Sequence, residues 1–201
     1  QVQVVCGEVT PYNVVSLLYA TSIDVPDRHS VDILKVDIDS YDCPVLQELL
    51  DVVDARLVLV EVNPSVPPPY RWAMLYHPEL WTFFSKQSSL QEVPIRGCSL
   101  AFQVDLLRRS GFYLLAFGGH DALFVHHSAA SAFAPLQPPV DEFDCYNEAF
   151  IAANGIPIEK TRRWFFTQSN VSAGLIELWE FFTDWMREHG APDLFPFALY
   201  A

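Results

Sequence analysis

Hydrophobic residues in the first third of the chain follow two patterns. Residues 32–38 and 57–62 are almost continuously apolar, which is typical of parallel strands buried on both faces of a sheet. Between them, from Pro44 onward, apolar residues recur at helical spacing and predict an amphipathic helix. A strand–helix–strand unit of this length predicts neighbouring parallel strands, whose carboxyl ends meet at one edge of the sheet.

Further elements are predicted on either side of this unit. Residues 1–5 are expected to form a short strand, and residues 98–111 a helix that a glycine ends. Residues 112–117 and 122–127 predict two antiparallel strands, because the glycine-rich turn between them is a hairpin signal. The prolines and aromatic residues of 64–94 predict a long extended loop, which in compact domains is often a lid or a binding loop.

This order of elements predicts an α/β fold: a partial Rossmann-like sheet, mostly parallel, with an antiparallel hairpin at its C-terminal end. The α/β domain is assigned to residues 1–127. Residues 128–201 are predicted to be a proline-containing linker followed by a helical appendage. Its longer helix, near residues 172–189, has a broad apolar face that is typical of packing against a core or another domain.

Composition excludes several classes of protein. The formal net charge of −13 argues against nucleic acid as a main partner, because phosphate binding needs clustered Lys and Arg. No apolar run is long enough to span a bilayer. Four widely spaced cysteines without a CxxC pair argue against zinc and indicate a reduced, intracellular protein, cytoplasmic or organellar, although two disulfides are compatible with the sequence. The chain begins at Gln1, which is compatible with the removal or omission of an upstream targeting segment.

Oxygen-bearing side chains cluster where the two apolar strands end. Asp37, Asp39, Glu61 and Asn63 form this group, which we call the acidic rim. Ligands bind at the carboxyl edge of open α/β sheets, and hard oxygen atoms of this kind suit Mg²⁺ or Ca²⁺. The sequence therefore predicts a metal site at the acidic rim. The alternative is that Asp39 or Asp42 caps the following helix by accepting hydrogen bonds from its first N–H groups.

Five further residues have candidate roles. His77 in the long loop and His120 in the hairpin turn could act as general bases, or be exposed side chains without a role. Tyr70 and Arg71 could line a substrate site, or pack the loop onto the sheet. Lys35 lies inside an apolar strand, where an unpaired charge is costly, so we expect it to pair with a carboxylate of the acidic rim or to extend from the sheet edge.

Several segments of the chain resemble one protein family. They are ILKVDIDSYD (33–42), LVEVNPSVPPPYRWAMLYHP (59–78), RGCSLAFQVDLLRRSGFYL (96–114) and HDALFVH (120–126). Together they resemble the FkbM-like group of class I S-adenosylmethionine-dependent methyltransferases, over the C-terminal half of that fold. The resemblance departs at one point: class I methyltransferases hold the cofactor on a Gly-rich loop after their first strand, and this sequence has no such loop.

The resemblance implies S-adenosylmethionine as cofactor and Mg²⁺ at the rim, with methyl transfer to an oxygen of a small molecule or sugar. On this hypothesis Asp37 would serve the cofactor, the metal and catalysis. The candidate residues found above would complete the site, with His77 removing the proton and Tyr70, Arg71 and His120 contacting the substrate.

Two further interpretations remain open. The chain could be a catalytically inactive, methyltransferase-like accessory subunit of a larger assembly, or a carbohydrate- or nucleotide-binding module that uses the same rim. The first is favoured by strand 32–38, which without its usual neighbour would be an exposed apolar edge. The expected partners are thus a small-molecule substrate, or other protein subunits that cover this edge.

Overall fold

The computed structural model describes residues 3–20, 29–87, 93–118, 120–136, 140–153, 159–166, 170–191 and 195–201. Its strands are β1 (His29–Val36), β2 (Val53–Glu61), β3 (Arg71–Met74), β4 (Phe112–Gly118), β5 (Asp121–His126) and β6 (Phe197–Tyr200). Its helices are α1 (Val14–Tyr19), α2 (Asp42–Val52), α3 (Leu80–Phe84), α4 (Leu100–Arg109), α5 (Ala130–Phe133), α6 (Glu142–Tyr146), α7 (Glu159–Phe166) and α8 (Val171–Glu188). Short 3₁₀ turns η2 (His127–Ala129) and η3 (Ala134–Leu136) and a π-helical segment η4 (Asn147–Ala152) complete the set.

The main sheet has four strands in the order β1-β2-β5-β4. The parallel pairing of β1 with β2 confirms the prediction for the strand–helix–strand unit. The pairing of β5 with β4 confirms the hairpin, and β5 is also antiparallel to β2. The sheet is therefore mixed: β1, β2 and β4 run in one direction, and β5, which belongs to the expected hairpin, runs in the opposite direction.

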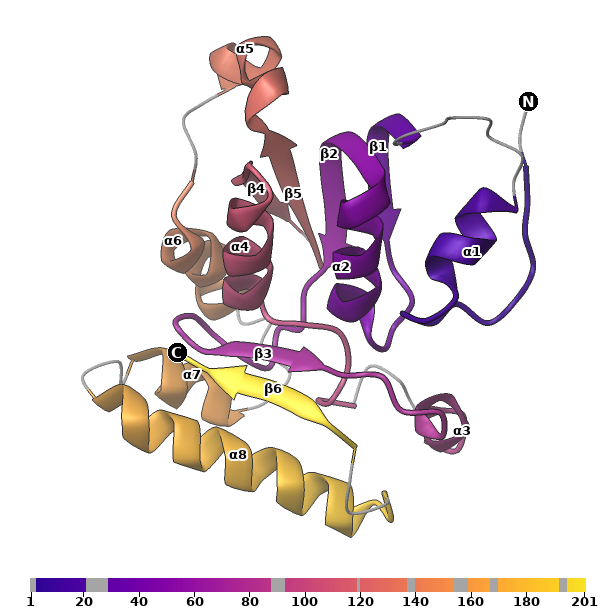
Figure 1. Ribbon diagram of the computed structural model, residues 1–201. Helices are drawn as coiled ribbons and strands as arrows, with labels where there is room; N and C mark the ends of the chain where they lie inside the picture. The colour runs from indigo at the N-terminus through magenta and orange to yellow at the C-terminus, as the bar shows by residue number, and fades with distance from the viewer. Residues whose placement is uncertain are drawn as a thin grey trace.

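Helices α2 and α4 cover one face of this sheet (Figure 1). Side chains alternate between faces along a strand, and the fully buried Val58 and Val60 of β2 belong to the covered face. The other face is less covered: Ile33 of β1 is 61% exposed, and its neighbour Leu57 is only half-buried. The α/β class is thus confirmed, with a sheet that the described residues cover mainly from one side.

A second, smaller layer lies below the main sheet in Figure 1 and joins distant parts of the chain. Strand β3 pairs antiparallel with β6 near the C-terminus, and the ring of Trp72 stacks on Phe182 of α8 with 5.0 Å between centroids. Tyr70, Trp72 and Met74 are fully buried. The segment 64–94 is therefore not an extended loop that acts as a lid. Its described part holds β3 and α3; Tyr70, Trp72, Phe83 and Phe84 belong to the core, while Trp81 is exposed.

Element boundaries differ from the predictions mainly at strand ends. Both parallel strands begin several residues earlier than expected, at His29 and Val53. Residues 3–5 are irregular, so the strand predicted over residues 1–5 is wrong in its described part. The long C-terminal helix, predicted near 172–189, is α8. None of the described helices combines the length and the apolar character that crossing a membrane requires.

Candidate functional site at the acidic rim

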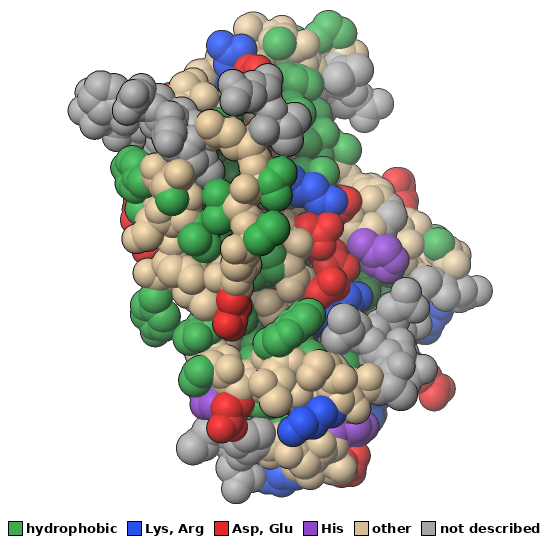
Figure 2. All heavy atoms as spheres, turned by 90° about the vertical axis from the view of Figure 1, so that its right-hand side faces the viewer, with side chains coloured by type: hydrophobic (Ala, Val, Ile, Leu, Met, Phe, Trp, Pro, Cys, Tyr) green, Lys and Arg blue, Asp and Glu red, His purple; other side chains and the backbone are tan. Residues whose placement is uncertain are grey.

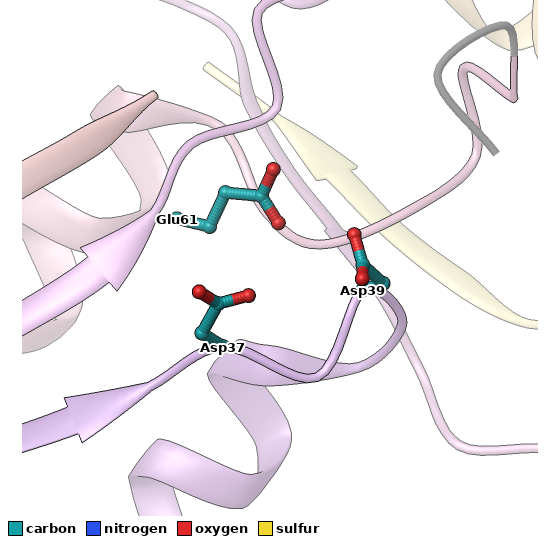
Figure 3. A group of neighbouring side chains, drawn as sticks. All are labelled: Asp37, Asp39 and Glu61. Atoms are coloured by element: carbon teal, nitrogen blue, oxygen red, sulfur yellow. The ribbon is translucent and has the colours of Figure 1, made fainter. Parts of the chain in front are cut away.

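Three carboxylates of the acidic rim converge at the carboxyl ends of the parallel strands. Asp37 directly follows β1, Glu61 is the last residue of β2, and Asp39 lies in the loop that leads to α2 (Figure 3). One oxygen of each carboxylate lies within 4.8 Å of the others, and no other described His, Cys, Asp and Glu side chains group in this way. The convergence that the strand–helix–strand unit predicts is therefore present.

Two cations hold these carboxylates in place. The Lys35 amine lies 2.9 Å from Asp37 and 3.7 Å from Asp121 of β5. The Arg96 guanidinium lies 2.6 Å from Asp39 and 3.5 Å from Glu61. Lys35 thus pairs with the rim as expected, while Arg96 and Asp121 are additional members that sequence reasoning missed.

The protonation of the rim depends on burial and on the neighbouring charges. Burial raises the pKa of Glu61 to about 7; the Arg96 guanidinium opposes this, and the nearby Asp39 adds to it. The hydrogen bond to Asp37 and the charge of Asp121 raise the pKa of the Lys35 amine. The charge of Glu61 therefore changes near neutral pH.

Asp42 shapes the loop that carries Asp39. Its fully buried carboxylate accepts hydrogen bonds from the backbone N–H of Ile38 at 2.9 Å and of Ser40 at 3.2 Å, and burial raises its pKa. Asp39 between them has a φ of 55°, the left-handed region that Asp tolerates better than most residues. The hydrogen bonds of Asp42 close the turn before α2, and the side chain of Tyr41, the N-cap residue of α2, makes no capping hydrogen bond. The capping alternative for Asp39 is not seen.

Asn63 does not join the three carboxylates. It is buried, and its amide nitrogen donates to the backbone carbonyls of Pro94 and Arg96, both at 2.8 Å. Its side-chain oxygen accepts from the backbone N–H of Ser65 at 2.8 Å. Asn63 therefore holds in place the loop that contains Arg96. Binding a metal ion through Asn63 would compete with these hydrogen bonds.

The four remaining candidate residues are dispersed. Tyr70 is fully buried beneath α8, and Arg71 lies over the ring of Tyr200 on β6. The ring of His77 packs edge-on against Phe195. His120 is exposed in the hairpin turn, and its backbone carbonyl accepts from the N–H of Val62. No described contact joins the side chain of any of these four residues to the acidic rim.

A disulfide lies beside the rim. Cys43, in the first turn of α2, is bonded to Cys98, two residues after Arg96, and both are buried. The expectation that all four cysteines are reduced is therefore wrong, because strand and loop geometry bring these two side chains together. The exposed Cys6 and the half-buried Cys145 are free.

A pocket of about 440 Å³ flanks the rim on the side of the N-terminal segment. Ile38, Ser40 and Tyr41, from the same loop as Asp39, form part of its wall, and the exposed Trp81 of α3 forms another part. On the face shown in Figure 2, acidic side chains gather beside hydrophobic ones near the middle. The rim therefore adjoins a largely apolar hollow.

The missed residues could be found only in part from the sequence. Arg96 begins one of the segments that carry the family resemblance, and Asp121 opens a predicted strand, but neither has a local signal for pairing with the rim. Comparison with known protein families, with curated proteins and with solved structures gives no match for this chain.

Proposed function

We propose that this chain is a methyltransferase-like protein that transfers a methyl group from S-adenosylmethionine to an oxygen of a small molecule or sugar. The observation that carries the proposal is the sheet order β1-β2-β5-β4, with only β5 reversed and three carboxylates at the carboxyl ends of β1 and β2. This is the arrangement that the resemblance to the C-terminal half of a class I methyltransferase implies.

In this proposal the acidic rim orients the substrate hydroxyl. Three carboxylates are a set of ligands that suits Mg²⁺, and Asp37, Asp39 and Glu61 would hold the ion. The ion would replace part of the ion pairing that Lys35 and Arg96 make with these carboxylates. A bound ion would lower the pKa of a substrate hydroxyl. His77, the general base expected from the sequence, packs its ring against Phe195.

The fit to S-adenosylmethionine is weaker. Asp37 is assigned to the cofactor by resemblance alone, and the described residues form no Gly-rich loop at a helix N-terminus that could hold it. For this reason the proposal describes no step of methyl transfer.

Calorimetric titration with S-adenosylmethionine tests the enzyme proposal. We expect saturable binding to the folded wild-type chain and much weaker binding to Asp37→Asn. Absence of heat at millimolar cofactor, with cooperative unfolding demonstrated on the same sample, would overturn the proposal for this chain.

The metal site has its own test. We expect Mg²⁺ or Mn²⁺ to raise the melting temperature at pH 8, where Glu61 is ionised, and to raise it less at pH 6. Asp37→Asn and Glu61→Gln should remove the effect. Asp54→Asn is the matched control, because Asp54 is exposed at the opposite end of β2. Equal shifts in all variants would exclude the rim as the site.

A second candidate function is that of an inactive accessory subunit. It is favoured by the missing Gly-rich loop and by the ion pairs that Lys35 and Arg96 already make with the rim. A folded chain that binds neither S-adenosylmethionine nor divalent cations is the outcome expected for this candidate.

A further inference from the structure

Strand β1 forms an outer edge of the main sheet. It pairs with β2 on one side, and none of the described residues pairs with it on the other. An edge strand of eight residues leaves a row of main-chain N–H and C=O groups without partners in the sheet, which is a template for another strand. Edge strands of this kind are usually short, charged or covered.

An aliphatic groove runs along this edge. Its volume is about 410 Å³, and it lies between β1, α1, α2 and the N-terminal segment. Its lining includes Val31, Ile33 and Lys35 of β1, with Val9 of the N-terminal segment and Leu18 of α1. Figure 2 looks toward this side of the molecule, where hydrophobic side chains are visible on the surface.

The two charged side chains of β1, Asp32 and Lys35, are both engaged in ion pairs. The Lys35 amine is drawn to the rim by Asp37 and Asp121, and Asp32 pairs with Arg56 of β2 at 3.2 Å. Lys35 therefore does not protect the edge as an outward-pointing lysine would. Beyond the C-terminal end of the strand lie carboxylates, including the exposed Asp37.

A second copy of this chain fits the edge poorly. In a symmetric antiparallel pair, alternation requires that a residue pairs with itself at the centre. Centring on Asp32 or on Lys35 sets like charges opposite each other, and centring on Ile33 sets Val31 opposite Lys35. Centring on Leu34 sets Ile33 opposite Lys35, so none of these four registers pairs an acid with a base.

We propose that β1 is a docking site for an extended strand of a different polypeptide. The strand carries branched aliphatic residues at alternate positions, which enter the groove, and a basic residue at the end next to the acidic rim. The main chain of β1 supplies the hydrogen bonds, and the groove supplies side-chain selectivity, as in other cases of strand addition. This site does not rest on methyl transfer.

The first test is amide hydrogen exchange of residues 29–36 in the full chain. The amides of β1 that do not bond to β2 should exchange fast in the free protein. Slow exchange at low protein concentration would mean that the chain covers its own edge. Protection that rises with protein concentration would mean that two copies pair. Either result overturns the proposal.

The second test uses a defined peptide: valine and threonine alternate over six positions between terminal lysines, both ends are capped, and a fluorescent label is attached. We expect binding by fluorescence anisotropy and new protection of residues 29–36. A peptide of the same sequence with N-methyl groups on alternate residues keeps the charge and loses the hydrogen bonds, so it should not bind. Equal binding of both peptides, or none at millimolar concentration, overturns the proposal.

The matched variants are Ile33→Lys and Ile176→Lys, because both isoleucines are 61% exposed and Ile176 lies far away on α8. Ile33→Lys should weaken peptide binding at least tenfold, and Ile176→Lys should leave it unchanged. Ile33→Thr replaces the first variant if the lysine variant does not fold. Unchanged binding in a folded Ile33 variant overturns the proposal.

Discussion

At the scale of single residues, Glu61 controls how the charge of the acidic rim depends on pH. Its folded-state pKa of about 7 lies above the ordinary value of 4.5, so folding favours the protonated form. The stabilisation is therefore complete below about pH 4.5 and is lost as pH rises through about 7. The upper limit of this loss is roughly 3 kcal/mol, at about 1.4 kcal/mol per unit.

We predict that Glu61→Gln makes the protein less sensitive to pH over this interval. The glutamine variant should gain stability relative to the wild type as pH rises from 5 to 8, because it does not ionise. Chemical denaturation at several pH values measures the difference. Parallel curves for the two proteins would show that Glu61 has an ordinary pKa.

The sequence predicts the rim at residue scale only where contacts follow from the local fold. Asp37 and Glu61 meet because a short strand–helix–strand unit makes their strands neighbours. Arg96 reaches Asp39 from a loop far along the chain, and no local pattern encodes that contact. Asn63 was assigned to the metal because it is an oxygen-bearing residue at a strand end, but its amide binds two backbone carbonyls.

At the scale of elements, the disulfide between Cys43 and Cys98 ties the start of α2 to the loop before α4. Its sequence separation is 55 residues, and closing a loop of this length in the unfolded chain contributes about 4 kcal/mol in the chain-entropy picture. The bond also fixes the chain two residues from Arg96.

We predict that the Cys43→Ala/Cys98→Ala double variant loses stability by up to about 4 kcal/mol in denaturant unfolding. A dithiol reductant should destabilise the wild type by a similar amount and leave the double variant unchanged. Cys6→Ala is the control, because Cys6 is exposed and free. A wild type that is insensitive to reductant in the unfolding transition would contradict this assignment.

Helix α8 packs closely against Tyr70 at Gly174. A Cβ atom at Gly174 would overlap the Tyr70 hydroxyl, which has no hydrogen-bond partner among the described residues. We predict that Gly174→Ala destabilises the protein by about 1–3 kcal/mol, although alanine favours helix more than glycine. Ser172→Ala, at an exposed position two residues before Gly174, should have little effect in the same thermal unfolding experiment.

The sequence predicts an element well when the pattern that indicates it lies within one short segment of the chain. In the hairpin of β4 and β5, two apolar segments and the glycine-containing turn between them are consecutive in the sequence. In α8, apolar residues recur at helical spacing over a long segment. Strands β3 and β6 have four residues each and pair across most of the chain, so neither has a recognisable pattern alone. Their pairing turned a predicted loop into part of the core.

At the scale of the whole molecule, the division predicted at residue 127 can be tested directly. Contacts cross it: β3 pairs with β6, and Trp72 stacks on Phe182. We predict that a fragment of residues 1–127 does not fold cooperatively, because Tyr70 and Trp72 would lose their cover. Near-ultraviolet circular dichroism and the cooperativity of unfolding measure this. A fragment that unfolds as cooperatively as residues 1–201 would show that the α/β part is independent.

The disulfide also gives the chain a covalent ring. Residues 43–98 close this ring, and it contains α2, β2, β3 and α3. A protease that cuts the backbone once anywhere inside the ring leaves two polypeptides joined through sulfur, which migrate as one molecule until they are reduced. A single cut outside the ring releases a separate fragment once the protein is denatured. Limited proteolysis, compared with and without reductant, would therefore distinguish cleavage between Cys43 and Cys98 from cleavage elsewhere in the chain.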